Sequence, residues 1–307
     1  MKIGIVDLDT SHPASWIPIE RAMGHEVVGV WDSGVVHPAG YAEKFAADRA
    51  IPRVFSSLVE MAAEVDCAVI HGCDWGTHIE KARPFLAKGK AVMVDKPLAG
   101  NVRDLRQLAQ WADQGKRITG GSALRYCVEV RHWLAMDPEQ RGRPHTVFCG
   151  CAVDEFNYGI HAYSLLSGIM GPGIISARHL GAGVQRRVQV NWADGRMGLI
   201  AVGKQAASLP FHASIVTERG QHQLVADPNL LYRALLEATL PYLSGQAETP
   251  PVPVRDLIEP ELAALAARQS WLNGNKEVRL AEVSEDDSGY DGAEFAAEYK
   301  RNKYGPR

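Results

Sequence analysis

KIGIVDLDTSHP (Lys2–Pro13) runs from a short apolar segment into the start of a helix. The apolar residues before Asp7 are typical of a buried strand. Thr10 or Ser11 suits the N-cap of the helix that follows, and Pro13 suits its first turn. Strand and helix then alternate to about residue 121, as a parallel sheet with crossover helices requires. We therefore predict a doubly wound α/β domain over residues 1–121.

The apolar pattern of this first half predicts five strands and five helices. The expected strands are Lys2–Val6, Glu26–Trp31, Cys67–His71, Ala91–Val94 and Arg117–Thr119. The expected helices are Ala14–Met23, Ala39–Ala47, Leu58–Ala63, Thr77–Ala87 and Val102–Gln114.

The second half, residues 122–307, has a different pattern and predicts an α+β domain with an open, mostly antiparallel sheet. Turn signals such as Ala193–Gly195 separate short strand-like runs, and Pro260–Trp271 has the pattern of a last amphipathic helix. Residues 284–307 are charged and poor in large aliphatic residues, so we expect a loosely held arm there. The strand-like runs are His145–Val153, Ile174–Leu180, Arg187–Trp192, Met197–Val202, His212–Thr217 and Gln221–Val225.

The composition and net charge indicate which class of molecule the protein binds. The 307 residues include 33 basic and 36 acidic ones, a net charge of −3 that favours neither nucleic acid nor a membrane surface. The first strand begins at Lys2 and no long apolar run follows, so we expect no signal peptide and no membrane span. The five cysteines are odd in number and lack C-x-x-C spacing, which suits reduced thiols in a reducing compartment. We expect a cytoplasmic protein that acts on a small molecule.

Asp32 is the first candidate for contact with a nucleotide. It ends the second strand about 25 residues after the first strand-to-helix turn. An acidic side chain there accepts hydrogen bonds from both ribose hydroxyls and repels a 2′-phosphate, which favours NAD over NADP. The alternative is that Asp32 only begins a turn at Ser33–Gly34.

The first turn lacks the glycines that let a pyrophosphate approach a helix N-terminus. Asp7 and Asp9 stand there instead and add negative charge. The groups left to meet a phosphate are the side chains and free N–H groups of Asp9, Thr10, Ser11 and His12. A metal site of Asp7, Asp9 and His12 is an alternative, but such clusters at helix starts more often act as caps, so we expect no metal.

Two later stretches carry the candidate chemistry. GKAVMVDKPLAGNVRDLRQLAQWA (Gly89–Ala112) presents Lys96 at the carboxyl end of a predicted strand, where α/β sheets bind ligands. NYGIHAYSLL (Asn157–Leu166) places His161 near the start of an apolar helix. Taken singly, such a lysine is usually a solvated charge and such a histidine a core residue. The presence of both Lys96 and His161 favours a shared functional role.

At these stretches the chain resembles the glucose-fructose oxidoreductase, inositol dehydrogenase and rhizopine-catabolism (Gfo/Idh/MocA) family, over about residues 2–281. VVGVWD resembles the family's second strand with its ribose-binding Asp, and VDKP its E-K-P motif. GGSALRY resembles the crossing between domains, and RQSWLNGNKEVRL the closing helix and strand. The resemblance implies a Rossmann domain, an open-sheet substrate domain, NAD(P), and oxidation or reduction of a carbon-bound hydroxyl in sugars, cyclitols or related compounds.

Site roles follow from the resemblance, position by position. Lys96 would hydrogen-bond the reacting hydroxyl, and His161 would be a second acid/base group with a pKa near the working pH. The family pattern D-x-G-x-H reads Asn157-Tyr158-Gly159-Ile160-His161 here. Asn157 cannot take a proton, although it can orient substrate.

The remaining roles are secondary. Asp154 or Glu155 would substitute for the absent carboxylate. Trp75 would wall the nicotinamide pocket, and His78 would lie beside it at the start of the next helix. Local packing and capping are the alternatives for Trp75 and His78.

Three functions remain open. The first is an NAD-dependent oxidoreductase acting on a polyhydroxylated small molecule, with Lys96, His161 and Asn157 in the catalytic site. The second is a redox-neutral isomerase or lyase of the same descent, with NAD lost or permanently bound. The third is a binding protein without catalysis. Because no helices of its own cover one face of the second sheet, we also expect a homodimer or homotetramer.

Overall fold

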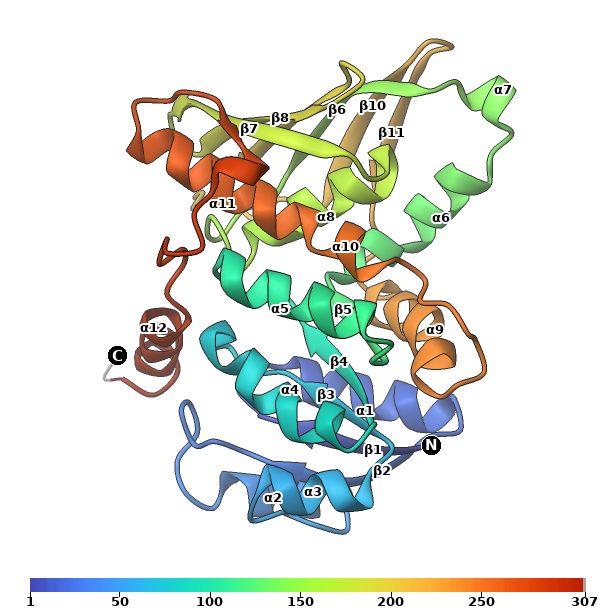
Figure 1. Cartoon of the computed structure of the whole chain (residues 1–307), viewed down its shortest axis with the longest axis vertical. Coiled ribbons are helices and arrows are strands. Elements are labelled where there is room, and N and C mark those ends of the chain that lie inside the picture. Colours follow the sequence, from blue (N-terminus) through green and yellow to red (C-terminus); the bar gives the residue numbers. More distant parts are fainter. Residues whose placement is uncertain (306–307) are drawn as a thin grey trace.

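The computed structural model describes residues 1–305. The lower part of the molecule in Figure 1 is built on a five-stranded parallel sheet. The strand order is β2-β1-β3-β4-β5, with every neighbouring pair parallel. This order confirms the predicted doubly wound fold. The strands are β1 (Lys2–Val6), β2 (Glu26–Trp31), β3 (Cys67–Ile70), β4 (Ala91–Asp95) and β5 (Ile118–Gly121).

The crossover helices lie on both faces of this sheet, and their bounds are within two residues of those predicted (Figure 1). Each strand is almost wholly buried, as expected when helices cover both faces. The helices are α1 (His12–Ala22), α2 (Tyr41–Asp48), α3 (Leu58–Glu64), α4 (His78–Ala87) and α5 (Val102–Asp113), with the short turn η1 (Trp75–Thr77) before α4.

The second sheet has the order β11-β10-β6-β9-β8-β7-β12 and is antiparallel except for the β6–β9 pair. Helices α8 (Gly159–Met170) and α11 (Glu259–Leu272) cover one face, and no helix of residues 1–305 covers the other, bare face (Figure 1). This confirms the predicted open sheet. The strands are β6 (Pro144–Gly150), β7 (Ile174–Ala182), β8 (Arg186–Trp192), β9 (Met197–Val202), β10 (His212–Thr217), β11 (Gln221–Val225) and β12 (Val278–Arg279).

Smaller elements connect the two sheets. The turn η2 (Ala123–Tyr126) packs against α8 and against α9 (Leu231–Leu243), and α9 also contacts α1 and β5. Helix α9 follows residue 121 in the sequence but packs on the parallel sheet. The predicted domain boundary at residue 121 therefore stays a prediction. The other short elements are α6 (Val128–Ala135), α7 (Pro138–Arg141), α10 (Val254–Leu257) and η3 (Leu280–Glu282).

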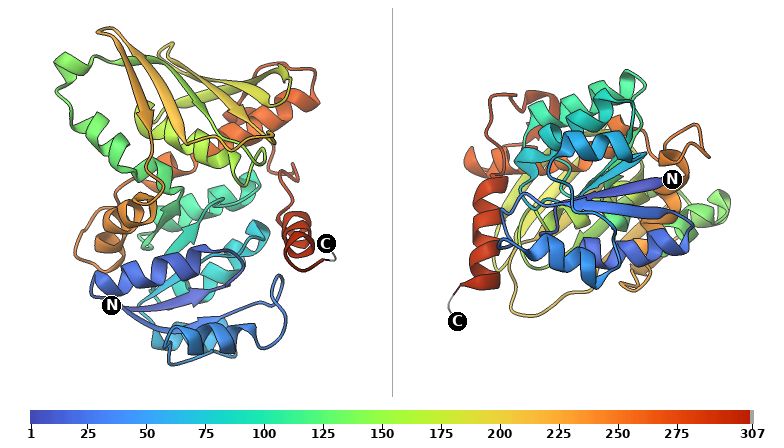
Figure 2. Two further views of the ribbon diagram at one scale, coloured as in Figure 1. Left: turned by 180° about the vertical axis from the view of Figure 1, so that it is seen from behind. Right: turned by 90° about the horizontal axis from the view of Figure 1, so that it is seen from below.

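The predicted loose arm is wrong for its described part, because residues 292–304 form the helix α12 (Gly292–Tyr304), which packs on the parallel sheet's domain (Figure 2). Residues 306–307 of that arm lie outside the described residues. The Asp291 carboxylate caps it by accepting a hydrogen bond from Glu294 N at 3.0 Å. Ala296 is fully buried against other apolar side chains, although few residues of the segment are apolar. A small buried residue gives a weak hydrophobic pattern, which is why composition missed this helix.

No helix among residues 1–305 is both long enough and apolar enough to cross a membrane. The five cysteines are all buried free thiols.

A buried glutamate in the core makes the free energy of unfolding depend on pH. Glu20, on the buried face of α1, is fully buried, and neither of its carboxylate oxygens has a hydrogen-bond partner within residues 1–305. This burial raises its pKa to about 8. The native state thus keeps a proton that the unfolded chain releases above its ordinary pKa of 4.5. The free energy of unfolding should therefore fall as pH rises from about 4.5 to about 8, by on the order of 4 kcal/mol.

Glu20→Met should reduce this slope and stabilise the protein at pH 8, as measured by urea unfolding at several pH values. Part of the slope should remain, because burial also raises the pKa of Glu261 to about 8. Glu43→Met, on the exposed side of α2, is the matched control and should keep the wild-type slope. A wild-type slope that survives in Glu20→Met would refute the assignment.

Candidate active site

Asp95, the last residue of β4, ties three loops together at the carboxyl edge of the parallel sheet. Its Oδ2 accepts hydrogen bonds from Nδ1 of His12 at 2.5 Å and Nδ1 of His71 at 2.9 Å. Its Oδ1 accepts one from Lys96 N at 2.7 Å. Burial by itself raises the pKa of Asp95, but the two imidazoles outweigh burial and hold this pKa well below its usual value. Asp95 is therefore a buried anion with its acceptors filled.

The two histidines on Asp95 differ in their surroundings. Burial lowers the pKa of His71, so its ring is neutral near pH 7, and its Nε2 is buried with no hydrogen-bond partner among the described residues. His12 stacks on Trp16, with ring centres 5.5 Å apart, and meets Tyr232 edge-on. Because its Nδ1 is held by Asp95, the orientation of His12 is fixed in the way that carboxylates fix catalytic histidines. Sequence reasoning missed His71, although it directly follows a strand at this edge.

Lys96 lies at the same edge, after β4, with a cis peptide bond to Pro97. Its Nζ donates to the backbone oxygen of Asn157 at 3.0 Å and to Oδ1 of Asn157 at 2.9 Å. Asn157 stands just before α8, so this contact joins the two halves of the chain. Burial lowers the pKa of Lys96 from its ordinary value.

His161 is in the first turn of α8. Its Nδ1 is 2.7 Å from Oγ of Ser122, and that oxygen also accepts a hydrogen bond from Leu124 N. Burial, and then the charge of Lys96, hold the pKa of His161 well below its ordinary value. The imidazole is therefore neutral at pH 7, and its pKa lies lower than the expected value near the working pH.

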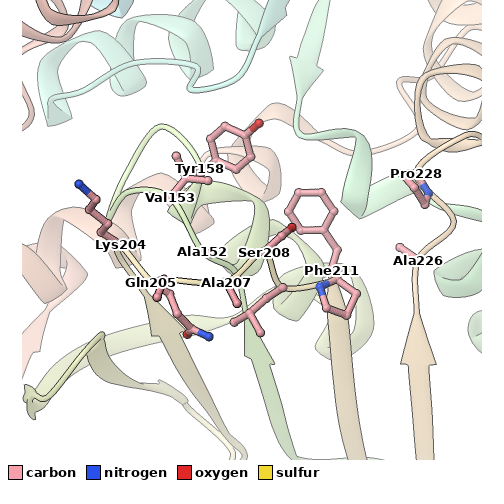
Figure 3. A pocket seen from close by; sticks show the side chains of 13 residues that line it. Ala152, Val153, Tyr158, Lys204, Gln205, Ala207, Ser208, Phe211, Ala226 and Pro228 are labelled. Atoms are coloured by element: carbon pink, nitrogen blue, oxygen red, sulfur yellow. The ribbon is translucent and has the colours of Figure 1, made fainter. Parts of the chain in front are cut away.

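These groups line one small cavity of about 160 Å³, which thus brings together Lys96, Asn157 and His161. A groove of about 780 Å³ adjoins it and shares Tyr158 and Phe211 with it. Figure 3 shows this larger groove, with Lys204 at one end and Pro228 at the other. The small cavity is also lined by Thr10, Ser11, His12, His71, Gly72, Cys73, Asp95, Ala123, Tyr158, Phe211, Leu231, Tyr232, Phe295 and Tyr299.

The acidic first turn is neutralised by a residue far away in the sequence. Asp7 is fully buried and accepts hydrogen bonds from Nζ of Lys81 at 2.5 Å and from Ser33 N at 3.1 Å. Its φ of 64° is the left-handed conformation that a glycine adopts without strain. Asp7 therefore keeps the backbone shape of a glycine turn while its side chain fills the space below it.

Asp9 and Asp32 also turn inward. Asp9 accepts a hydrogen bond from Cys73 N at 2.9 Å, and burial followed by the charge of Asp7 raises its pKa to about 6. Asp32 accepts one from Leu8 N at 3.1 Å, and burial raises its pKa as well. Asp9 thus joins the loop after β1 to the loop after β3, and Asp32 joins the loop after β2 to the loop after β1.

The hydroxyls expected near a phosphate have local roles. Thr10 Oγ1 accepts a hydrogen bond from His12 N at 3.2 Å. Ser11 is the N-cap residue of α1, but its side chain makes no capping bond.

Trp75 and His78 pack within the fold instead of walling the small cavity. The Trp75 indole N–H donates to Tyr290 O at 2.7 Å, and its ring packs against Phe156 and Phe295. The two ring nitrogens of His78 face Leu98 O at 3.1 Å and Gly72 O at 2.8 Å. Both residues hold the loops around the site.

Neither predicted substitute for the absent carboxylate reaches the cavity. Asp154 Oδ1 accepts hydrogen bonds from Phe156 N and Tyr158 N, at 3.0 and 2.8 Å. Glu155 pairs with Arg186. Asn157 therefore has no acidic replacement from these two positions.

The Lys81–Asp7 pair yields a stability prediction. Lys81→Met leaves a buried carboxylate without its cation and should lower the free energy of unfolding by about 3–5 kcal/mol. Adding Asp7→Gly removes that carboxylate and suits the positive φ, so the double variant should recover most of the loss. Urea unfolding at pH 7.5 measures both. A double variant no more stable than Lys81→Met would contradict the pairing.

Comparison with known proteins finds a family match for the parallel-sheet segment of the chain. Residues 1–120 match the family model GFO_IDH_MocA, described as an oxidoreductase family with an NAD-binding Rossmann fold. The oxidoreductase YceM of Salmonella typhimurium is 31% identical over 117 residues, 38% of this chain and 36% of the relative. A trans-1,2-dihydrobenzene-1,2-diol dehydrogenase of Oryctolagus cuniculus is 34% identical over 85 residues, 27% of this chain and 25% of the relative. The matched segments thus span about a third or less of these relatives.

The fold likeness extends further than the sequence likeness. The scyllo-inositol dehydrogenase of Lactobacillus casei, solved with NAD(H) and scyllo-inositol bound, superposes with a TM-score of 0.74 at 16% identity, covering 92% of this chain and 99% of the other. At that identity the likeness shows the fold alone. Residues 1–120 of this chain therefore match the Gfo/Idh/MocA oxidoreductase family with its NAD-binding Rossmann fold, and most of the chain shares the fold of the L. casei enzyme.

Proposed function

We propose that the chain is an oxidoreductase that acts, with NAD, on a hydroxyl or carbonyl group of a sugar, cyclitol or related small molecule. One observation carries the proposal: Lys96, Asn157 and His161 meet in one small cavity at the carboxyl edge of a family Rossmann fold. The substrate of the L. casei structure and the names of the relatives support this class of substrate.

The proton chemistry follows from the side chains. An ammonium has three N–H donors, and Lys96 uses two on Asn157, which leaves one for a substrate oxygen. The positive charge then stabilises an alkoxide as it develops. His161 is neutral, so it can accept the hydroxyl proton.

NAD would accept or donate the hydride, and Asp32 is the family position for its ribose. The crevice as folded does not fit a dinucleotide, because α12 covers the loops after β1 and β2. Lys303 Nζ, in α12, donates to Asp9 O at 3.1 Å, and Tyr304 Oη, also in α12, is 2.6 Å from Nδ1 of His37.

The covered crevice favours a second candidate, a redox-neutral isomerase or lyase. Lys96 and His161 move protons in either case, and the carboxylates of Asp7 and Asp9 occupy the turn that a pyrophosphate would approach. Turnover by protein shown to be free of NAD, with none added, would select this candidate.

Three further expectations belong to the proposal. The larger groove beside the cavity would hold the part of the substrate that does not react. The bare sheet face carries apolar residues such as Phe148 and Val216, and we propose that a second copy covers it. A cytoplasmic location stays a prediction.

Removal of either acid/base group should stop or slow catalysis. Lys96→Ala should abolish turnover, and His161→Asn should lower kcat by about 10²–10⁴-fold. The assay follows NADH at 340 nm with a panel of sugars and cyclitols, and circular dichroism checks folding. Lys88→Ala, an exposed lysine at the end of α4, should match the wild type. A near-normal kcat in Lys96→Ala would remove Lys96 from the mechanism.

The pH profile should reflect both lowered pKa values. His161 must be neutral to accept a proton, so the acid limb of kcat/KM should lie well below pH 6.5. Lys96 must be charged, so the alkaline limb should lie below pH 10.5. Activity measured from pH 4.5 to 10.5 should thus be flat through neutrality, whereas an acid limb at pH 6.5 or above would contradict the role of His161.

A further inference from the structure

The geometry points to α12 as an occupant of the dinucleotide crevice that competes with NAD for the carboxyl ends of β1, β2 and β3. NAD would then bind only when α12 moves away. This inference rests on the proposed function in one respect, that NAD is the cofactor.

The crevice is defined by the topology. In a doubly wound sheet, ligands bind outside the carboxyl ends of the strands where the strand order reverses, which here is between β1 and β3. The pyrophosphate of a dinucleotide lies at the turn between β1 and α1, and its ribose lies at the end of β2. Three loops therefore form the binding surface, one after each of these strands.

Polar contacts join α12 to the first two loops. Nζ of Lys303 donates to Asp9 O in the loop after β1, at 3.1 Å. Nζ of Lys300 donates to Val35 O in the loop after β2, at 3.0 Å. Tyr304 Oη is 2.6 Å from Nδ1 of His37, and the other ring nitrogen of His37 faces Leu8 O at 2.9 Å. One helix thus bridges the ribose loop and the pyrophosphate turn.

Apolar contacts close the space between α12 and the third loop. Ala296 is fully buried in a cluster with Val36 and Cys73, and Phe295 packs on Trp75 with ring centres 5.1 Å apart. At the start of α12, a Cβ on Gly292 would lie only 2.7 Å from Trp75 N. This approach leaves no room for a nucleotide layer between the helix and the loop after β3.

The segment before α12 supplies a fixed pivot. Tyr290 N donates to Gly100 O at 2.9 Å, and Tyr290 O accepts the indole N–H of Trp75 at 2.7 Å. Asp287 pairs with Arg268 at 3.1 Å. The chain is therefore anchored up to Tyr290, and α12 can leave the crevice by rotation at Asp291 and Gly292 while the anchor stays in place.

The test uses the full chain and two neighbouring alanines of α12. Ala296→Arg puts a large charged side chain into the buried cluster and should release α12. Ala297→Arg makes the same change on the exposed face and is the matched control. Hydrogen exchange of residues 292–304 reports whether the helix is released, and calorimetric titration with NAD gives Kd without any turnover.

We expect faster exchange of α12 and at least tenfold tighter NAD binding in Ala296→Arg, with wild-type behaviour in Ala297→Arg. Saturating NAD should also speed exchange of α12 in the wild type. If Ala296→Arg does not fold, Lys303→Ala, which removes the contact to Asp9, should shift both readouts in the same direction.

Two results would overturn competition. One is an unchanged Kd in a variant whose α12 exchanges faster, and the other is protection of α12 by NAD. If the released variant binds no NAD at millimolar concentration, both competition and the NAD-linked function fail. If it binds NAD tightly but turns over no substrate, competition stands and only the oxidoreductase assignment fails.

Discussion

The site depends on one buried carboxylate. Asp95 ends β4, the strand between β3 and β5, and accepts N–H bonds from His12, His71 and the backbone of Lys96. Because these donors come from the loops after β1, β3 and β4, the position of each loop is fixed relative to the others. A buried carboxylate with fewer hydrogen-bond donors would be protonated or would destabilise the fold. The three donors therefore keep Asp95 ionised, and the ionised Asp95 keeps the three donors in place.

The second constraint is the exchange of glycines for ionisable side chains. Positions 7, 9 and 12 have the spacing of the glycine fingerprint of dinucleotide-binding turns, and they carry Asp, Asp and His. Glycines at such positions leave space for a ligand's phosphates, whereas these side chains add ionisable groups at the turn and bond to Lys81, Cys73 N and Asp95. The turn has become a polar core that α12 covers.

Sequence reasoning predicted the parts of the molecule that have strong local patterns. The five strands of the parallel sheet, their helices and the open second sheet are as expected, and Lys96, Asn157 and His161 do share a cavity. The partner of Asp7 could not be predicted, because Lys81 is 74 residues away and faces inward from a helix. The docking of α12 was missed because its buried contact is made by an alanine. The pKa of His161 was misjudged because burial depends on tertiary packing.

The contact between Lys96 and Asn157 also sets the electrostatic potential of the cavity. An aspartate at position 157 would form an ion pair with the ammonium and cancel most of its field. The asparagine solvates the ammonium through two oxygens and carries no charge of its own. A ligand that arrives as an anion, or becomes one, therefore meets a more positive potential beside Lys96 than a carboxylate at position 157 would leave.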